Sequence, residues 1–267
     1  MRQAFLTVIA CVCVCFCGGC AGTLVPPPPP DVRAGLERAG ELSSRGKLPQ
    51  ACAAADAILR KHDRDWSVHL AVFRMWIQEE RFREAGTVGL AIVDGRSRIT
   101  LPRALTNREF AAIAVNASQA LAASGRAKES ERALDAAVRA DPRSAEAANN
   151  LAYQLAEEER DLPKALRLAK IAVELAPKQG YIVDTLGWVY FKMGRMPEAR
   201  HWLARAVELS PGDGELRAHL ARAHLKAGEL PGAYVEMQKA LALAPYVPEV
   251  RSLRAAVIRR YNPQGPL

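Results

Sequence analysis

Five histidines and six cysteines are the residues from which metal or thiol chemistry in this chain would start. The histidines show no H-E-x-x-H spacing, and His219 and His224 are five positions apart, which places them on different faces of a helix. The sequence has no glycine-rich phosphate loop, no G-x-S-x-G elbow and no thiol with an obvious neighbouring base. It therefore predicts that the protein is not an enzyme and that it uses no metal and no cofactor.

The cysteines are concentrated at the N-terminus. Five of them lie in or at the end of the apolar stretch that follows Arg2: Cys11, Cys13, Cys15, Cys17 and Cys20. Residues 1–19 are typical of an export signal, and their apolar run is shorter than a typical membrane-spanning helix. The mature chain then has Cys52 alone, so no intrachain disulfide is available, and this cysteine is expected to be a small buried hydrophobe.

The end of this stretch resembles the lipobox of bacterial lipoproteins, in which small residues such as Gly18 and Gly19 precede an acylated cysteine. The resemblance implies that Cys20 carries the lipid and that the protein is exported and anchored at the periplasmic face of the outer membrane of a Gram-negative bacterium. Ala21, rather than aspartate, follows the cysteine, which favours the outer membrane by likeness to enterobacterial sorting. Cys17 departs from the usual leucine, and Cys11 is a rival site. The same stretch is also compatible with a cleaved signal without lipid and with an uncleaved anchor.

Residues 20–31 form the expected tether between this lipid and the folded part. Five consecutive prolines, Pro26 to Pro30, favour polyproline II geometry, which extends about 3.1 Å per residue and gives a stiff spacer of roughly 15 Å.

The rest of the chain is organised by helical periodicity. Between Gly180 and Pro211, two amphipathic helices are predicted, with Gly194 in the turn between them. The pattern L-G-x2-Y-x3-G-x4-A-x6-A-x4-P, from Leu186 to Pro211, resembles the tetratricopeptide (TPR) repeat. The neighbouring stretches match it in register, since Pro142, Pro177, Pro211 and Pro245 recur at an almost constant interval that equals the length of such a repeat.

The resemblance implies an all-α fold, a right-handed α-solenoid of about six TPR helix pairs with a C-terminal capping helix. Residues 32–97 are expected to form two degenerate repeats, and residues 98–110 an insertion or linker that is either a contact arm or a tolerated break. Residues 111–247 are expected to form four repeats, and residues 248–267 the capping helix and tail.

In such a solenoid the first helices of successive repeats line a concave groove. The spacing predicts that Tyr153, Trp188 and Arg222 lie on successive rungs of this surface, with Trp188 exposed as an aromatic anchor for a peptide. The alternative is that Trp188 packs against the adjacent repeat. Asn116 and Asn150 occupy the position where some TPR proteins hold the ligand backbone, but Thr185 and His219 follow there. The predicted groove residues are Asn116, Asn149, Asn150, Tyr153, Asp184, Trp188, Lys192, Arg222 and Lys226.

The net charge and the family likeness limit the kinds of partner that are expected. The formal net charge is +8, which favours acidic partners or anionic surfaces without choosing between them. No zinc-finger spacing or RNA-binding pattern is present, so nucleic acid is not expected, and neither is a small-molecule substrate. The partner is expected to be a protein or peptide of the cell envelope.

The segments NNLAY (149–153) and DTLGW (184–188) resemble a subgroup of TPR proteins of Gram-negative bacteria, many of them exported or lipidated. This likeness implies an accessory in assembly of a pilus, a secretion system or the outer membrane. The alternatives are an accessory subunit of an exopolysaccharide synthesis or export complex, and a structural spacer without a groove ligand.

Overall fold

The structure is a computed structural model that describes residues 28–95 and 105–261, and these ranges contain thirteen α-helices and no β-strand. The N-terminal segment with Cys20 and most of the expected insertion lie outside them. The helices are α2 (Pro30–Ser44), α3 (Leu48–Lys61), α4 (Trp66–Gln78), α5 (Phe82–Asp94), α6 (Asn107–Ala123), α7 (Ala127–Ala140), α8 (Ala145–Glu157), α9 (Leu162–Leu175), α10 (Gly180–Lys192), α11 (Met196–Leu209), α12 (Gly214–Ala227), α13 (Leu230–Leu243) and α14 (Pro248–Arg260).

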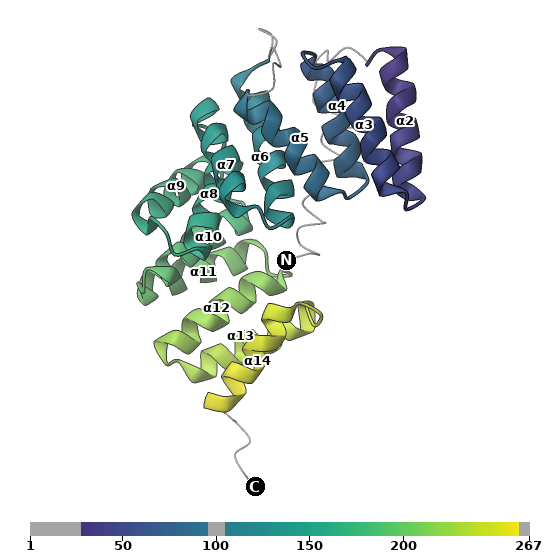
Figure 1. The fold of residues 1–267 in the computed structure, drawn as a ribbon. Coiled ribbons are helices and arrows are strands. Elements are labelled where there is room, and N and C mark those ends of the chain that lie inside the picture. Colours follow the sequence, from purple (N-terminus) through teal and green to yellow (C-terminus); the bar gives the residue numbers. More distant parts are fainter. Residues whose placement is uncertain (1–27, 96–104, 262–267) are drawn as a thin grey trace.

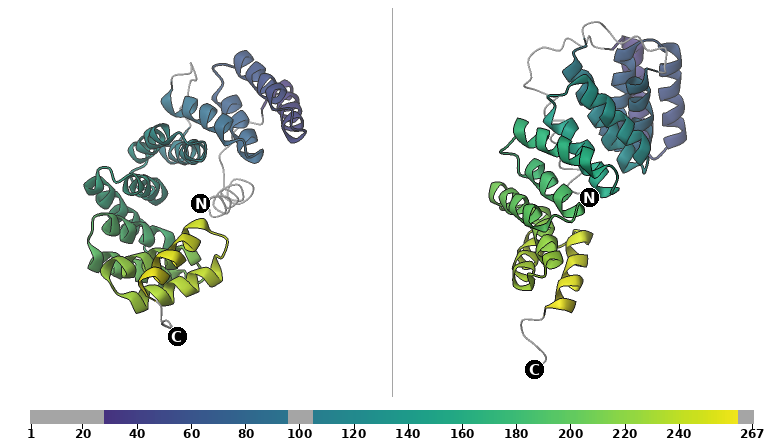
Figure 2. Two further views of the ribbon diagram at one scale, coloured as in Figure 1. Left: turned by 60° about the horizontal axis from the view of Figure 1, so that its bottom comes forward. Right: turned by 90° about the vertical axis from the view of Figure 1, so that its left-hand side faces the viewer.

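Consecutive helices pack as antiparallel pairs, and the pairs stack in chain order (Figure 1). The first helix of each pair also packs against the pair before it, so α12 contacts α10 and α11, and α14 contacts α12 and α13 in the same way. The stack bends into an arc (left panel of Figure 2). The predicted all-α solenoid is therefore confirmed. None of the described helices is long and apolar enough to cross a bilayer.

Small residues allow the two helices of a pair to approach closely. A Cβ atom on Gly187 of α10 would lie 2.7 Å from Cγ of Leu203 and 2.9 Å from its backbone nitrogen. Ala199 and Ala206 of α11 are completely buried at the same seam, and Leu186 fills the space beside them. Because protein interiors pack at crystal-like density, glycine and alanine at these positions fix the distance between the helices.

The break in the period after α5 does not divide the core. Gly89 of α5 lies so close to α6 that an added Cβ would be 2.7 Å from Cβ of Ala117. Ile113 of α6 belongs to the same buried cluster as Phe73 and Ile92 of the preceding pair. The stack therefore continues across the segment between Asp94 and Thr106.

A single type of turn joins the two helices of every pair. At residues 46, 80, 125, 159, 194 and 228 the backbone adopts positive φ, and the next residue donates its N–H to the carbonyl five positions earlier. This is the Schellman arrangement, which satisfies carbonyls at the end of the first helix. Glycine occupies four of the six positions, whereas Glu80 and Glu159 adopt the left-handed conformation with a side chain.

Two helices begin earlier than the sequence pattern indicated. The α6 helix starts at Asn107, inside the expected linker 98–110, because Thr106 and Glu109 form a capping box. The Thr106 hydroxyl oxygen accepts a hydrogen bond from the Glu109 N–H, and the Glu109 carboxylate accepts one from the Thr106 N–H. The α2 helix starts at Pro30, inside the expected tether, because proline is tolerated in the first turn, where its missing N–H has no helical partner.

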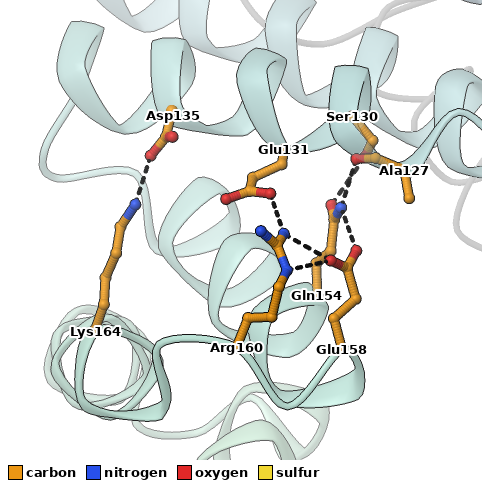
Figure 3. A network of polar contacts seen from close by, with 8 residues as sticks. All are labelled: Ala127, Ser130, Glu131, Asp135, Gln154, Glu158, Arg160 and Lys164. Atoms are coloured by element: carbon orange, nitrogen blue, oxygen red, sulfur yellow. Dashed lines mark hydrogen bonds and ion pairs between the residues drawn. The ribbon is translucent and has the colours of Figure 1, made fainter.

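Polar contacts join neighbouring pairs along the helix ends, as Figure 3 shows for α7, α8 and the turn before α9. Arg160 forms ion pairs with Glu131 and Glu158. Lys164 reaches Asp135 at 2.9 Å, and the Gln154 amide donates to the carbonyl of Ala127 at 2.7 Å. Exposed ion pairs contribute little each, so these contacts fix register more than they add stability.

Candidate functional site

The first helices of the last three pairs, together with α14, enclose a pocket. We call it the α8–α14 pocket. Its wall includes side chains from α8, α10 and α12: Tyr153, Glu157, Trp188, Glu215, His219 and Arg222. Tyr153, Trp188 and Arg222 thus line one pocket from the first helices of three successive pairs, as the repeat period in the sequence places them.

Trp188 does not project freely into this pocket, and the expectation that it would be exposed is wrong. Its side chain is only 4% exposed. The indole stacks on Phe191 with ring centroids 4.6 Å apart, and on His219 of the next pair with centroids 4.2 Å apart. Its N–H donates to the Glu157 carboxylate at 2.6 Å. Trp188 is therefore packed between three helices, so its truncation would leave a cavity.

Behind the indole, a buried pair of titratable groups connects α10 to α12. Oδ2 of Asp184 lies 2.7 Å from Nδ1 of His219, and the Asp184 side chain is 6% exposed. Burial raises the pKa of the Asp184 carboxyl, although His219 opposes this shift. Burial alone would lower the pKa of His219, but the Asp184 carboxylate outweighs it and raises that pKa. The pair holds the His219 ring against Trp188.

The predicted cations lie around the same aromatic cluster. Nζ of Lys192 is 5.3 Å from the Trp188 ring centroid and 3.4 Å from the Glu157 carboxylate. The Arg222 guanidinium is 5.9 Å from the Trp188 centroid, and the exposed Lys226 lies 4.5 Å from the Phe191 ring. These contacts with aromatic faces are cation–π interactions. Lys192 is thereby engaged within the protein, whereas Lys226 remains accessible at the rim.

The predicted asparagines do not form a continuous row of ligand-facing side chains along the stack. Asn149 is buried, donates its amide to Oδ1 of Asn150 at 3.2 Å, and leaves its own Oδ1 without a partner. Asn150 and Asn116 are partly exposed on α8 and α6. At the next equivalent position, Thr185 donates to the carbonyl of Tyr181 in its own helix. Any clamp on a ligand backbone would therefore rest on α6 and α8 alone.

Part of the pocket comes from a helix to which the sequence pattern assigned only a capping role. Glu249, Val250 and the preceding Val247 line it from the start of α14. Glu249 lies one full repeat after Glu215, so the repeat period could have identified it. The α14 helix occupies the position of a further first helix, which brings its first turn into the same wall as α8, α10 and α12.

The described residues contain no group of three His, Cys, Asp or Glu side chains placed to hold a metal ion. Cys52 on α3 is a partly buried free thiol. Its pKa is raised, chiefly by burial, which disfavours the reactive thiolate. The pocket itself presents carboxylates, one guanidinium and apolar side chains.

Three models of the tetratricopeptide repeat match the chain, at residues 115–180, 184–213 and 203–257. No curated protein sequence matches it. Among solved structures, a tetratricopeptide repeat protein from Parabacteroides merdae is similar over 86% of this chain and 87% of its own length, with 13% identity and a TM-score of 0.65.

The MamA protein is similar over 67% of this chain and 91% of its own, with 17% identity and a TM-score of 0.53. The Cut9–Hcn1 hetero-tetramer of the APC/C has a chain that matches 90% of this one over 44% of its own length, with 15% identity and a TM-score of 0.58. At these identities the likeness concerns the fold alone.

The Asp184–His219 pair predicts a measurable titration. Because the pKa of His219 is raised in the folded protein, the folded state binds more protons than the unfolded state, and stability is lost as pH rises through that pKa. We expect the His219 ring, followed by NMR and assigned with His219→Gln, to titrate above its ordinary value of about 6.5.

In Asp184→Asn the carboxylate is gone while burial and Arg222 remain, so the same ring should titrate below that value. A His219 pKa that is the same in both proteins would contradict the assigned pair.

Proposed function

We propose that this chain, which carries tetratricopeptide repeats, is an envelope-anchored scaffold that binds a segment of another protein along its first helices. A tetratricopeptide-repeat scaffold is suited to protein–protein interaction. The observation that carries the proposal is the α8–α14 pocket, to which the first helices of three successive pairs and the start of α14 contribute side chains. A surface built from several repeats can hold an extended segment, since each repeat supplies one part of the contact.

The aromatic cluster supports this proposal by making the wall rigid before a partner arrives. Trp188 is fixed by two stacked rings and by the Glu157 carboxylate, and Arg222 donates to the carbonyl of Glu249 at 3.3 Å. A preformed wall lowers the entropy lost on binding. Polar groups at its edges supply orientation, while apolar surface supplies affinity.

The proposed cellular location of the scaffold is based on the N-terminal sequence. A lipid on Cys20 would attach the chain to a membrane, and the residues between Cys20 and α2 would separate the solenoid from that surface. We place the protein at the periplasmic face of the outer membrane, where an envelope assembly accessory would meet partners of a pilus, a secretion system or the outer-membrane assembly pathway.

Site-specific photo-crosslinking in cells tests the binding surface. A photoreactive amino acid in place of Lys226, at the rim of the aromatic cluster, should give adducts with a defined partner protein. The matched control is Lys170, which is also exposed but lies on α9, a helix that supplies no residue to the pocket, whereas Lys226 lies on α12, which supplies four. Equal adducts from both positions, or adducts only from position 170, would contradict the proposed surface and favour a spacer role.

Metabolic labelling with a radioactive or alkyne-bearing fatty acid tests the anchor. Acylation requires the thiol, so Cys20→Ser should lose the label. The variant should also move from the membrane to the soluble fraction, because the lipid chain is the part that inserts into the bilayer. Cys52→Ser, which removes the thiol of α3, should keep both the label and the membrane attachment. Label retained in Cys20→Ser would rule out this attachment site, and loss in Cys11→Ser would identify the rival cysteine.

A further inference from the structure

Two glutamates in the α8–α14 pocket form no ion pair with any residue that the structure describes. Glu215 lies in the first turn of α12 and Glu249 in the first turn of α14, one repeat apart, and both line the pocket. In the described part of the chain neither carboxylate takes part in an ion pair. Glu157, by contrast, receives the Trp188 N–H and Lys192. Two acceptor groups are therefore available to a ligand.

A buried oxygen atom without a donor on one of these carboxylates supports the same conclusion. Oε2 of Glu249 is inaccessible to solvent and accepts no hydrogen bond. A buried acceptor without a donor costs free energy, most of all when it is charged. A ligand that brings N–H donors to this wall would remove part of that cost.

The one guanidinium in the pocket does not neutralise these carboxylates. Nη2 of Arg222 donates to the backbone carbonyl of Glu249, and the group lies over the Trp188 ring. The pKa of the Glu215 carboxyl is raised, chiefly by burial and further by Asp213 and Glu249, although His219 opposes the shift. Glu215 and Glu249 thus repel each other, and a cation placed between them would be favoured.

Apolar side chains of the wall lie beside the two carboxylates. Ala218 and Val250 are buried, and Val247 is partly exposed beside them. Lysine and arginine side chains match such a wall, because their methylene stems pack against apolar surface while their charged ends donate hydrogen bonds to acceptors. A compact inorganic cation would leave the apolar wall uncovered.

We infer that the α8–α14 pocket accepts a lysine or arginine side chain of the bound protein segment, with its cationic end between Glu215 and Glu249 and its stem against Ala218, Val247 and Val250. This inference rests on the proposed binding function, which it makes more specific. It also assigns α14 a part in recognition, since half of the acceptor pair belongs to that helix.

Peptide selection tests the inference without knowledge of the natural partner. Random linear peptides displayed on phage are selected against the wild-type protein, against Glu215→Gln/Glu249→Gln, and against Glu84→Gln. Glu84 is the matched control, a first-turn glutamate on α5 outside the pocket. Circular dichroism verifies that each variant is folded.

Wild type and Glu84→Gln should enrich peptides with a basic residue at one fixed position, and the double variant should lose that enrichment. Replacing the fixed lysine of a selected peptide by norleucine should weaken binding to wild type at least about thirtyfold, the lower end of what truncating one partner of a desolvated charge pair costs. The double variant should bind both peptides alike.

Peptides selected without a basic preference, or with the same preference in the double variant, would overturn the inference and leave the proposed binding function intact. Failure to enrich any peptide on any of the proteins would overturn both.

Discussion

The close approach of the two helices in each pair is the constraint on which the rest of this structure depends. At Gly187 there is no room for even one additional carbon atom beside Leu203. An amphipathic helix of thirteen or fourteen residues is not stable alone, so each pair must form this seam and then bury its remaining apolar face against the next pair. The positions of the first helices, and of every side chain on their free face, follow from that spacing.

The α8–α14 pocket shows how such stacking produces a site that no single repeat contains. Trp188 touches α8 through Glu157 and α12 through His219, so three helices fix one indole ring. The buried Asp184–His219 pair fastens α10 to α12 from behind. Because both contacts cross repeat boundaries, the pocket is rigid only when the register of the stack is correct. A partner segment would therefore meet a preformed surface whose charge pattern is set by four helices.

The sequence was sufficient to predict the helix pairs, their turns and the common surface of Tyr153, Trp188 and Arg222, because all of these follow from the regular repeat period. It left the environment of Trp188 open between exposure in the groove and packing against the adjacent repeat, since exposure depends on which side chains lie on the neighbouring helices. Phe191 and His219 cover the indole, and helical spacing alone does not disclose a stacked contact between α10 and α12. The role of α14 was likewise hidden, because the repeat pattern indicated only a capping helix there, while Glu249 at its start lines the pocket.

The most direct test of this account compares the unfolding free energies of Gly187→Ala and Gly212→Ala by chemical denaturation. Gly212 has no atom within 4 Å of an added Cβ, so this substitution should leave stability within about 1 kcal/mol of the wild type. Gly187→Ala should lose about 1–3 kcal/mol through overpacking against Leu203, and should perturb the near-ultraviolet signal of Trp188 on the same helix. Equal stability of the two variants, with the tryptophan signal unchanged, would contradict the claim that close approach within the pair positions the pocket wall.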